Sequence, residues 1–191
     1  MTAPRSDASN VPNSIVLVGF MGSGKSSIGR RLAWRLQLEA IDLDDYIEQR
    51  AGQSIAALFA AHGEAAFRDL ETAALRECLQ KPGVLATGGG VLKRKQNRAL
   101  LRAATEQGAI VVYLRAGPVA LARRIRRQPG KRPLVAGEAV LDEEATRRRV
   151  EQLLVERAPL YEACSSLIVD TDDFDLAQVV QQIITSLKPR S

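Results

Sequence analysis

Short, continuous apolar runs alternate with longer amphipathic segments along most of this chain. The first run, IVLV at 15–18, is too short for a helix and rich in β-branched residues, so it predicts a strand buried on both faces. A helical pattern follows from about Lys25, with Ile28, Leu32 and Leu36 at fourfold spacing. The same order recurs, which predicts an α/β domain with a mainly parallel five-stranded sheet flanked by helices. The other runs that predict strands are EAID at 39–42, VLAT at 84–87, AIVVYL at 109–114 and SLIVD at 166–170.

The segments outside this alternation predict three further parts of the chain. Residues 1–12 are polar and contain two prolines, which predicts a flexible tail before a single domain at 13–188. From 43 to 80 the pattern is helical with breaks near Gly52 and Gly63, so we expect an all-helical acceptor-binding insertion beside the sheet. Residues 127–138 combine glycine, proline and cationic side chains between two helices, which is typical of a mobile lid.

Length and composition are those of one ordinary globular domain. The chain has 191 residues, of which 46% are hydrophobic and 26% charged, and this composition does not indicate widespread disorder. No apolar run approaches the ~20 residues of a membrane-spanning helix, and the amino terminus lacks the apolar segment of a signal peptide. We therefore expect a cytoplasmic protein without a membrane partner. Cys78 and Cys164 lack CxxC spacing and a flanking histidine, which favours reduced structural thiols over zinc ligands.

The net charge of +5 raises the alternative of a nucleic-acid partner. Arginine is concentrated at 123–133 and 147–157, but none of the aromatic residues lies in these two stretches. Base stacking therefore has no platform there, and a solvated helix face is the simpler interpretation. Trp34 lies on the helix predicted after the first strand, where we expect it to pack against its neighbours.

The glycine-rich stretch GFMGSGKS at 19–26 fits the pattern G-x-x-x-x-G-K-[ST] of a phosphate-binding loop. It follows a predicted buried strand and precedes a predicted helix, which is the context that this motif requires. Glycines let the backbone turn successive N–H groups towards an anion, and the following helix adds its positive end. Lys25 would reach the outer phosphates of a bound polyphosphate, and the Ser26 hydroxyl would ligate Mg²⁺.

An acidic pair lies at the predicted strand-to-helix junction IDLDD. Asp42 could hold Mg²⁺ directly or through water, and Asp44 could accept or orient the proton of an acceptor hydroxyl. The alternative is that both residues only cap a helix, because aspartate favours such positions. The pair by itself does not decide between these interpretations.

Three further signals point to the same site. Arg68 lies on a predicted helix of the insertion with Glu71 one turn later, so Glu71 could orient it, although a surface ion pair would look the same. The sequence GGG at 88–90 follows a strand, where open parallel sheets bind ligands, although it also suits a flexible loop. The stretch RQPGKRPL at 127–134 could bring cationic side chains onto a transferring phosphoryl group.

Taken together and in this order, these motifs resemble those of the shikimate kinase family. The resemblance covers about 14–187 and rests on GFMGSGKSSIG, IDLDDYIE, SIAALFAAHGEAAFRDLE, TGGG, KRPL, ERAPLY and IVDT. It implies a nucleoside monophosphate kinase-like fold and transfer of the ATP γ-phosphate to the 3-hydroxyl of shikimate, with Mg²⁺ as the metal cofactor.

The resemblance also implies roles for individual positions. It assigns catalysis to Lys25, Asp44 and Arg132, and Mg²⁺ to Ser26 and Asp42. The shikimate-binding positions are Asp44, Arg68, Gly89, Gly90 and Arg157, with the two arginines on the carboxylate. The ATP-binding positions are Gly22, Ser23, Gly24, Lys25, Ser26, Ser27, Arg127, Arg132 and Asp170, of which Arg127 and Asp170 border the adenine.

Two other functions remain open on the sequence. A related small-molecule kinase, for example one acting on gluconate, would share the ATP apparatus without needing Arg68, the glycines at 88–90 and Arg157 together. A basic ATP-binding regulator that contacts nucleic acid would explain the charge but not the acidic pair. Our expectation is a monomeric enzyme with shikimate as its small-molecule partner and without a nucleic-acid partner.

Overall fold

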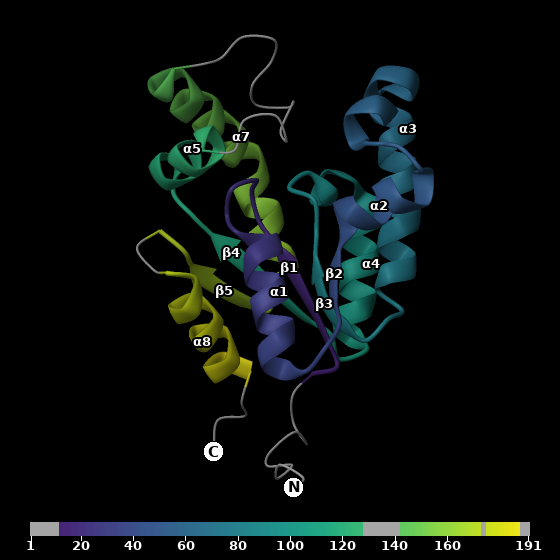
Figure 1. The fold of residues 1–191 in the computed structure, drawn as a ribbon. Coiled ribbons are helices and arrows are strands. Elements are labelled where there is room, and N and C mark those ends of the chain that lie inside the picture. Colours follow the sequence, from purple (N-terminus) through teal and green to yellow (C-terminus); the bar gives the residue numbers. More distant parts are fainter. Residues whose placement is uncertain (1–11, 128–141, 173–174, 188–191) are drawn as a thin grey trace, which may run out of the picture.

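A parallel five-stranded sheet forms the centre of the protein in a computed structural model, which describes residues 12–127, 142–172 and 175–187 (Figure 1). The strand order is β2-β3-β1-β4-β5, and each neighbouring pair runs parallel. The predicted α/β class and the five predicted strands are therefore confirmed. The strands are β1 (Ser14–Val18), β2 (Ala40–Asp42), β3 (Gly83–Ala86), β4 (Ile110–Arg115) and β5 (Leu167–Asp170).

Alternate side chains of the strands enter two separate cores on the two faces of the sheet. Ile15 and Leu17 of β1 pack with α1 (Lys25–Leu36) and α8 (Leu176–Leu187), which lie in front of the sheet in Figure 1. Val16 and Val18 join the other core, to which α4 (Lys95–Glu106) and α7 (Glu143–Cys164) contribute. Because helices cover both faces, successive strand residues are all apolar, which explains the continuous runs in the sequence.

The predicted helical insertion consists of α2 (Leu43–Ala51) and α3 (Ile55–Cys78). The first helix ends at Gly52, whose φ of 67° is left-handed. The second helix changes direction at Gly63, where φ is 76° and ψ is 175°. Both predicted breaks are confirmed. In Figure 1, α2 and α3 stand on one side of the molecule, and α5 (Pro118–Arg126) stands on the other with the start of α7.

The register of the sheet brings three motifs to one edge. Ala86, at the end of β3, pairs with Leu17 of β1 and with Asp42 of β2. The phosphate loop at 19–24, the start of α2 and the glycine tract at 88–90 all leave the strands at this edge. This is the carboxyl edge of an open parallel sheet, where ligands bind in α/β proteins.

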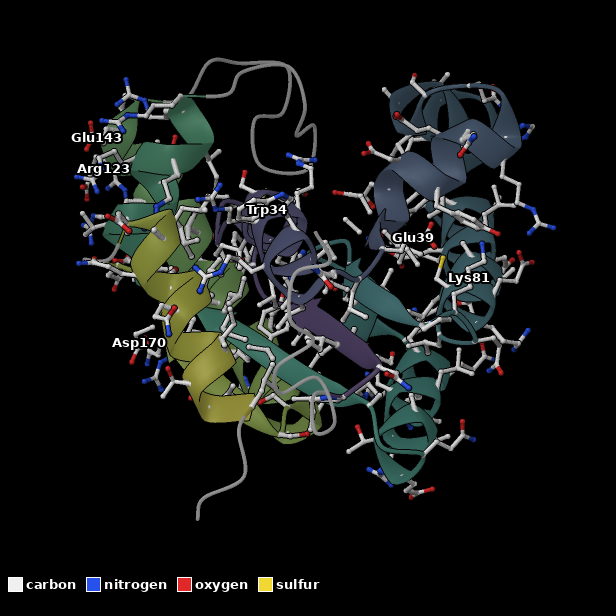
Figure 2. All side chains as sticks on the ribbon, turned by 60° about the horizontal axis from the view of Figure 1, so that its bottom comes forward. Trp34, Glu39, Lys81, Arg123, Glu143 and Asp170 are labelled. Atoms are coloured by element: carbon white, nitrogen blue, oxygen red, sulfur yellow. The ribbon has the colours of Figure 1, made fainter. Side chains whose placement is uncertain are left out.

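The prediction that Trp34 packs against its neighbours is wrong. The residue, labelled in Figure 2, is 67% exposed, and the guanidinium carbon of Arg31 lies 4.8 Å from the centre of its ring. The residues that α1 buries include Ile28 and Leu32, and the helical period places Trp34 opposite them. A cation–π contact with Arg31 therefore replaces burial of the indole.

The predicted tail and lid fall almost wholly outside the described residues, which exclude 1–11 and 128–141. The predicted helical insertion and the sheet lie inside them. Within 12–127, 142–172 and 175–187, no helix has the length and apolar character needed to cross a membrane.

Candidate active site

The motif at 19–26 forms a tight turn between β1 and α1. Gly24 precedes α1 with a φ of 94°, and Gly19 has a φ of 146°, so both occupy the left-handed region that favours glycine. A Cβ atom at Gly19 would lie 2.6 Å from the carbonyl oxygen of Leu114, so a side chain does not fit there. Ser26 and Ser27 lie in the first turn of α1. The loop backbone and the amino-terminal end of α1 thus form the predicted anion-binding arrangement.

Two polar side chains of this loop are buried. Lys25 is 7% exposed, and its Nζ donates hydrogen bonds of 2.8 Å to the carbonyl oxygens of Gly19 and Phe20. Gly22 turns the loop with a φ of 84°, and the buried Oγ of Ser23 after it has no hydrogen-bond partner among the described residues. An unsatisfied buried polar group costs about 1–3 kcal/mol. A phosphate oxygen in the loop would give the Ser23 hydroxyl an acceptor.

The two aspartates at the start of α2 have different surroundings. Asp42 ends β2 and caps α2, because its Oδ1 accepts hydrogen bonds from the backbone N–H of Asp44 at 3.1 Å and of Asp45 at 3.5 Å. Asp42 therefore caps the helix, and its role as a Mg²⁺ ligand stays a prediction. The carboxylate of Asp44 reaches the glycine tract, where a Cβ atom at Gly88 would lie 2.9 Å from Oδ1.

The environment of Asp44 changes its acidity. Burial, and after it the negative charges of Asp42 and Glu71, raises the pKa of this carboxyl from 3.8 to about 6. The positive charge of Lys25 acts in the opposite direction and lowers the pKa. Asp44 therefore shares one electrostatic environment with the phosphate loop, and its carboxyl takes up a proton not far below neutral pH.

The substitution Asp44→Asn should stabilise the folded protein at pH 8. The raised pKa means that the folded state binds the Asp44 proton more tightly than the unfolded chain, so stability is lost as pH rises from about 4 to about 6. Replacing the partly buried carboxylate by an amide should recover on the order of 2 kcal/mol in the free energy of unfolding at pH 8. Urea denaturation of both proteins at pH 8 and pH 5 measures this gain. A gain that does not shrink towards pH 5 would contradict the raised pKa.

The glycine tract at 88–90 is a packed junction and not a flexible loop. A Cβ atom at Gly89 would lie 2.9 Å from the backbone nitrogen of Met21 in the phosphate loop. At Gly90 it would lie 2.8 Å from Nη2 of Arg68. The tract therefore contacts the phosphate loop through Gly89 and the helical insertion through Gly90. A side chain at either position would push the tract away from these two parts.

Two glutamates hold Arg68 in place. Its Nη1 donates to both carboxylate oxygens of Glu71, at 2.9 and 2.8 Å. Its Nε and Nη2 donate to Oε1 of Glu64 at 3.3 and 3.2 Å, and Lys93 donates to the same oxygen at 3.1 Å. The predicted orientation of Arg68 by Glu71 is confirmed. The alternative of a surface ion pair is wrong, because both side chains are buried.

A second arginine reaches the tract from α7. Arg157 is 6% exposed, and its guanidinium carbon lies 5.3 Å from the centre of the Phe20 ring. Its Nη1 is buried and has no hydrogen-bond partner within the described part of the chain. Arg157 and Gly89 border one small cavity. A buried cation with an unused donor indicates a binding position for an anionic group.

Sequence reasoning missed Tyr161, which lies in the same cavity. Its hydroxyl donates a hydrogen bond to the carbonyl oxygen of Gly89. The available signal was its position four residues after Arg157, because this spacing places two side chains on one face of a helix.

Among the described residues, no hydrogen bond or ion pair joins Asp170 or Arg127 to this cluster. Asp170 ends β5 at the edge of the sheet and pairs with Arg115, with Nε–Oδ1 and Nη2–Oδ2 distances of 2.5 and 2.8 Å. Arg127 follows the end of α5 and is exposed. Arg132 lies outside the described residues.

The residues predicted to hold Mg²⁺ lie on one cleft. Ser26 and Asp42 both border an open cleft between α1, β2 and α2. Within the described ranges, no group of three or more His, Cys, Asp or Glu residues is arranged to hold a metal ion. Hydroxyl and carboxylate oxygens suit Mg²⁺, which usually keeps several water or phosphate ligands as well. The two residues therefore fit a magnesium ion that binds together with a polyphosphate.

Comparison with known proteins identifies relatives that match most of the chain. A family model described as shikimate kinase matches residues 21–188. A shikimate kinase of Bordetella pertussis is 44% identical over 175 residues, which cover 91% of this chain and 78% of the relative. A shikimate kinase of Thioalkalivibrio sulfidiphilus is also 44% identical, over 172 residues that cover 90% of this chain and 85% of the relative.

Solved structures of related proteins have the same fold as this chain. Shikimate kinase from Acinetobacter baumannii in complex with shikimate superposes with a TM-score of 0.82 at 34% identity, covering 93% of each chain. A gluconokinase from Sinorhizobium meliloti superposes with a TM-score of 0.59 at 23% identity, again covering 93% of each chain. The second likeness is evidence for a shared fold alone.

Proposed function

The chain belongs to the shikimate kinase family, whose model matches 21–188, and from this premise we propose that it transfers the γ-phosphoryl group of ATP to the 3-hydroxyl of shikimate. One observation of the site carries the proposal. The phosphate loop lies directly against a glycine tract to which two buried arginines, Arg68 and Arg157, add positive charge. Shikimate is a carboxylate with several hydroxyls, and guanidinium groups are the usual partners of a carboxylate.

The two arginines suit a shared role on the substrate carboxylate. Glu71 and Glu64 hold Arg68, whereas Arg157 keeps a buried donor that has no hydrogen-bond partner among the described residues. Burial raises the pKa of Tyr161, and the positive charges of Arg157 and Arg68 both lower it, so both arginines act electrostatically on this one hydroxyl. Gly89 and Gly90 would line the ring of the substrate between that point and the phosphate loop.

For the nucleotide, the loop from Gly22 to Ser27 would cradle the phosphates, with Lys25 on the outer ones. Arg132 would act from the lid, outside the described residues. Arg127 and Asp170 would border the adenine. Mg²⁺ held by Ser26 and Asp42 would neutralise charge on the β- and γ-phosphates. We also propose a monomer without a nucleic-acid partner, because one chain supplies all the residues assigned to both substrates.

Asp44 is the residue that we assign to the acceptor hydroxyl. Its carboxylate faces the glycine tract and shares an electrostatic environment with Lys25. A carboxylate with a raised pKa is a better proton acceptor than an ordinary one. It would orient the 3-hydroxyl towards the phosphoryl group and take up its proton as the new bond forms. Protonation of Asp44 below about pH 6 would remove this base.

The substitutions Arg68→Lys and Arg157→Lys should each raise the KM for shikimate by about tenfold or more and change the KM for ATP by less than about twofold. A lysine keeps the charge but cannot reproduce the planar, two-donor contact of a guanidinium with a carboxylate. Steady-state kinetics with each substrate varied in turn measures the split. Arg94→Lys is a matched control, because Arg94 pairs with the exposed Asp69 of the same insertion. Equal increases in both KM values would contradict the carboxylate assignment.

The acceptor itself is tested by comparing substrates. ADP formation from ATP should depend on shikimate and should exceed the rate with gluconate at equal concentration by orders of magnitude. A gluconate rate equal to the shikimate rate would favour the other small-molecule kinase. Binding to single-stranded or duplex nucleic acid that weakens steeply with salt, without turnover of either acceptor, would instead favour the regulator.

A further inference from the structure

The ring of Tyr161 is buried where α7 packs against the sheet. It lies on α7 one turn after Arg157 and is 1% exposed. The ring lies against that of Tyr113 on β4, with 5.1 Å between ring centres and 31° between ring planes. Because two buried rings support each other here, the position of the Tyr161 hydroxyl is well determined by packing.

The Tyr161 hydroxyl holds the middle carbonyl group of the glycine tract. The carbonyl oxygen of Gly88 accepts a hydrogen bond from the backbone N–H of Val91 at 3.2 Å, and that of Gly90 accepts one from Lys93 at 3.1 Å. These two contacts are local to the tract and the short helix after it. The carbonyl oxygen of Gly89 instead accepts from Tyr161, a side chain that is 72 residues away in the sequence.

A movement of Gly89 would change the contacts of the tract with both the phosphate loop and Arg68. Its Cα packs so closely against the phosphate loop that a Cβ atom would lie 2.9 Å from the nitrogen of Met21. The next residue, Gly90, packs equally closely against the guanidinium of Arg68. Burial raises the pKa of Tyr161, so its hydroxyl keeps the donated proton over the working pH range.

We propose that Tyr161 is a positioning residue for the acceptor, because its hydroxyl ties the glycine tract at 88–90 to the helix that carries Arg157. The proposal rests on the function proposed above. Tyr161 acts through Gly89 and does not itself touch the substrate. This hydrogen bond keeps the tract at a fixed distance from α7. Gly89 and Gly90, which would line the substrate ring, therefore keep their position relative to Arg157, which would bind the carboxylate.

The test is Tyr161→Phe, which keeps the buried ring and removes the hydrogen bond. The KM for shikimate should rise about fivefold, the usual effect of losing one such bond, while the KM for ATP changes by less than about twofold. Tyr113→Phe is the matched control, because its ring belongs to the same pair and, among the described residues, its hydroxyl makes no hydrogen bond to the tract. This control should leave both KM values unchanged.

A second measurement makes the result independent of turnover. Both variants are measured at a temperature below their melting transitions. In ¹⁵N-labelled protein, the amide resonances of Gly89 and Gly90 should shift in Tyr161→Phe and should not shift in Tyr113→Phe. Unchanged shikimate KM in Tyr161→Phe, or the same increase in both variants, would overturn the positioning role. A wild-type protein that does not phosphorylate shikimate would overturn the proposed function instead, which keeps the two failures distinct.

Discussion

The substitution Lys25→Met should lower the rate of phosphoryl transfer by about a thousandfold or more and leave the fold intact. Lys25 is buried in the phosphate loop, where its ammonium group is the charge nearest to the expected phosphates. Charge that develops on a transferring phosphoryl group is stabilised by such a fixed cation, and a methionine of similar length supplies none. The rate is measured as ADP release at saturating ATP and shikimate.

The fold should survive because the loop is shaped mainly by its backbone. Gly19 and Gly24 keep their left-handed conformations, and the turn is closed by the hydrogen bond of 3.2 Å from the Ser23 N–H to the Phe20 carbonyl oxygen. Circular dichroism and thermal melting of the variant check this point. Lys95→Met, which removes an exposed lysine at the start of α4, is the control and should retain full activity. A folded Lys25→Met protein with an ordinary rate would contradict the ATP-site assignment.

The substitution Asp44→Asn should lower turnover by about 10²- to 10⁴-fold while Mg·ATP binding stays within about twofold of the wild type. The amide has nearly the same shape as the carboxylate but cannot accept a proton from the acceptor hydroxyl. Because Asp44 faces the glycine tract and Asp42 borders the cleft with Ser26, loss of the Asp44 charge should affect the acceptor side first. Calorimetry for the nucleotide and initial rates for transfer separate the two effects.

An exposed carboxylate of α3 provides the control for this variant. Asp69→Asn changes a side chain outside the cleft that Ser26 and Asp42 border, and it should leave turnover within about twofold of the wild type. The wild-type rate at saturating substrates should fall as pH decreases through about 6, as Asp44 becomes protonated, and the remaining rate of Asp44→Asn should lack this step. Normal turnover in Asp44→Asn would contradict the role of Asp44 as the proton acceptor and would leave it only a structural role at the start of α2.

The parts of the fold that sequence reasoning predicted well are those set by local pattern. The run at 15–18 is apolar throughout because its strand is buried on both faces, and the loop after it needs left-handed residues that only glycine adopts easily. The breaks at Gly52 and Gly63 follow from the same conformational freedom. These features depend on a few consecutive residues, so they are visible without the tertiary structure.

The parts that remained ambiguous depend on contacts between distant segments. Asp42 and Asp44 look alike in the sequence, and only the approach of Gly88 and the nearby charge of Glu71 distinguish Asp44 as the carboxyl with the raised pKa. The burial of Arg68 with Glu71 was equally undecided, since the same spacing on an exposed helix gives a surface pair.

Single aromatic residues were the least predictable. Trp34 was expected to pack and is exposed, because the buried face of α1 was already filled by smaller apolar residues. Tyr161 received no role, because its spacing from Arg157 does not reveal that its partner is the backbone carbonyl of Gly89, 72 residues away. The lid residues around Arg132 lie outside the described structure, so their assignment stays a prediction.

The most direct measurement of the central claim is the position of the phosphate on the product. Wild-type protein is incubated with ATP, Mg²⁺ and shikimate, and the product is examined by phosphorus–proton correlation NMR. The account predicts one phosphorylated product, with the phosphorus coupled to the proton on the carbon that carries the 3-hydroxyl, formed in equal amount to ADP. Release of inorganic phosphate without a phosphorylated acceptor, or coupling to the proton of a different carbon, would contradict it.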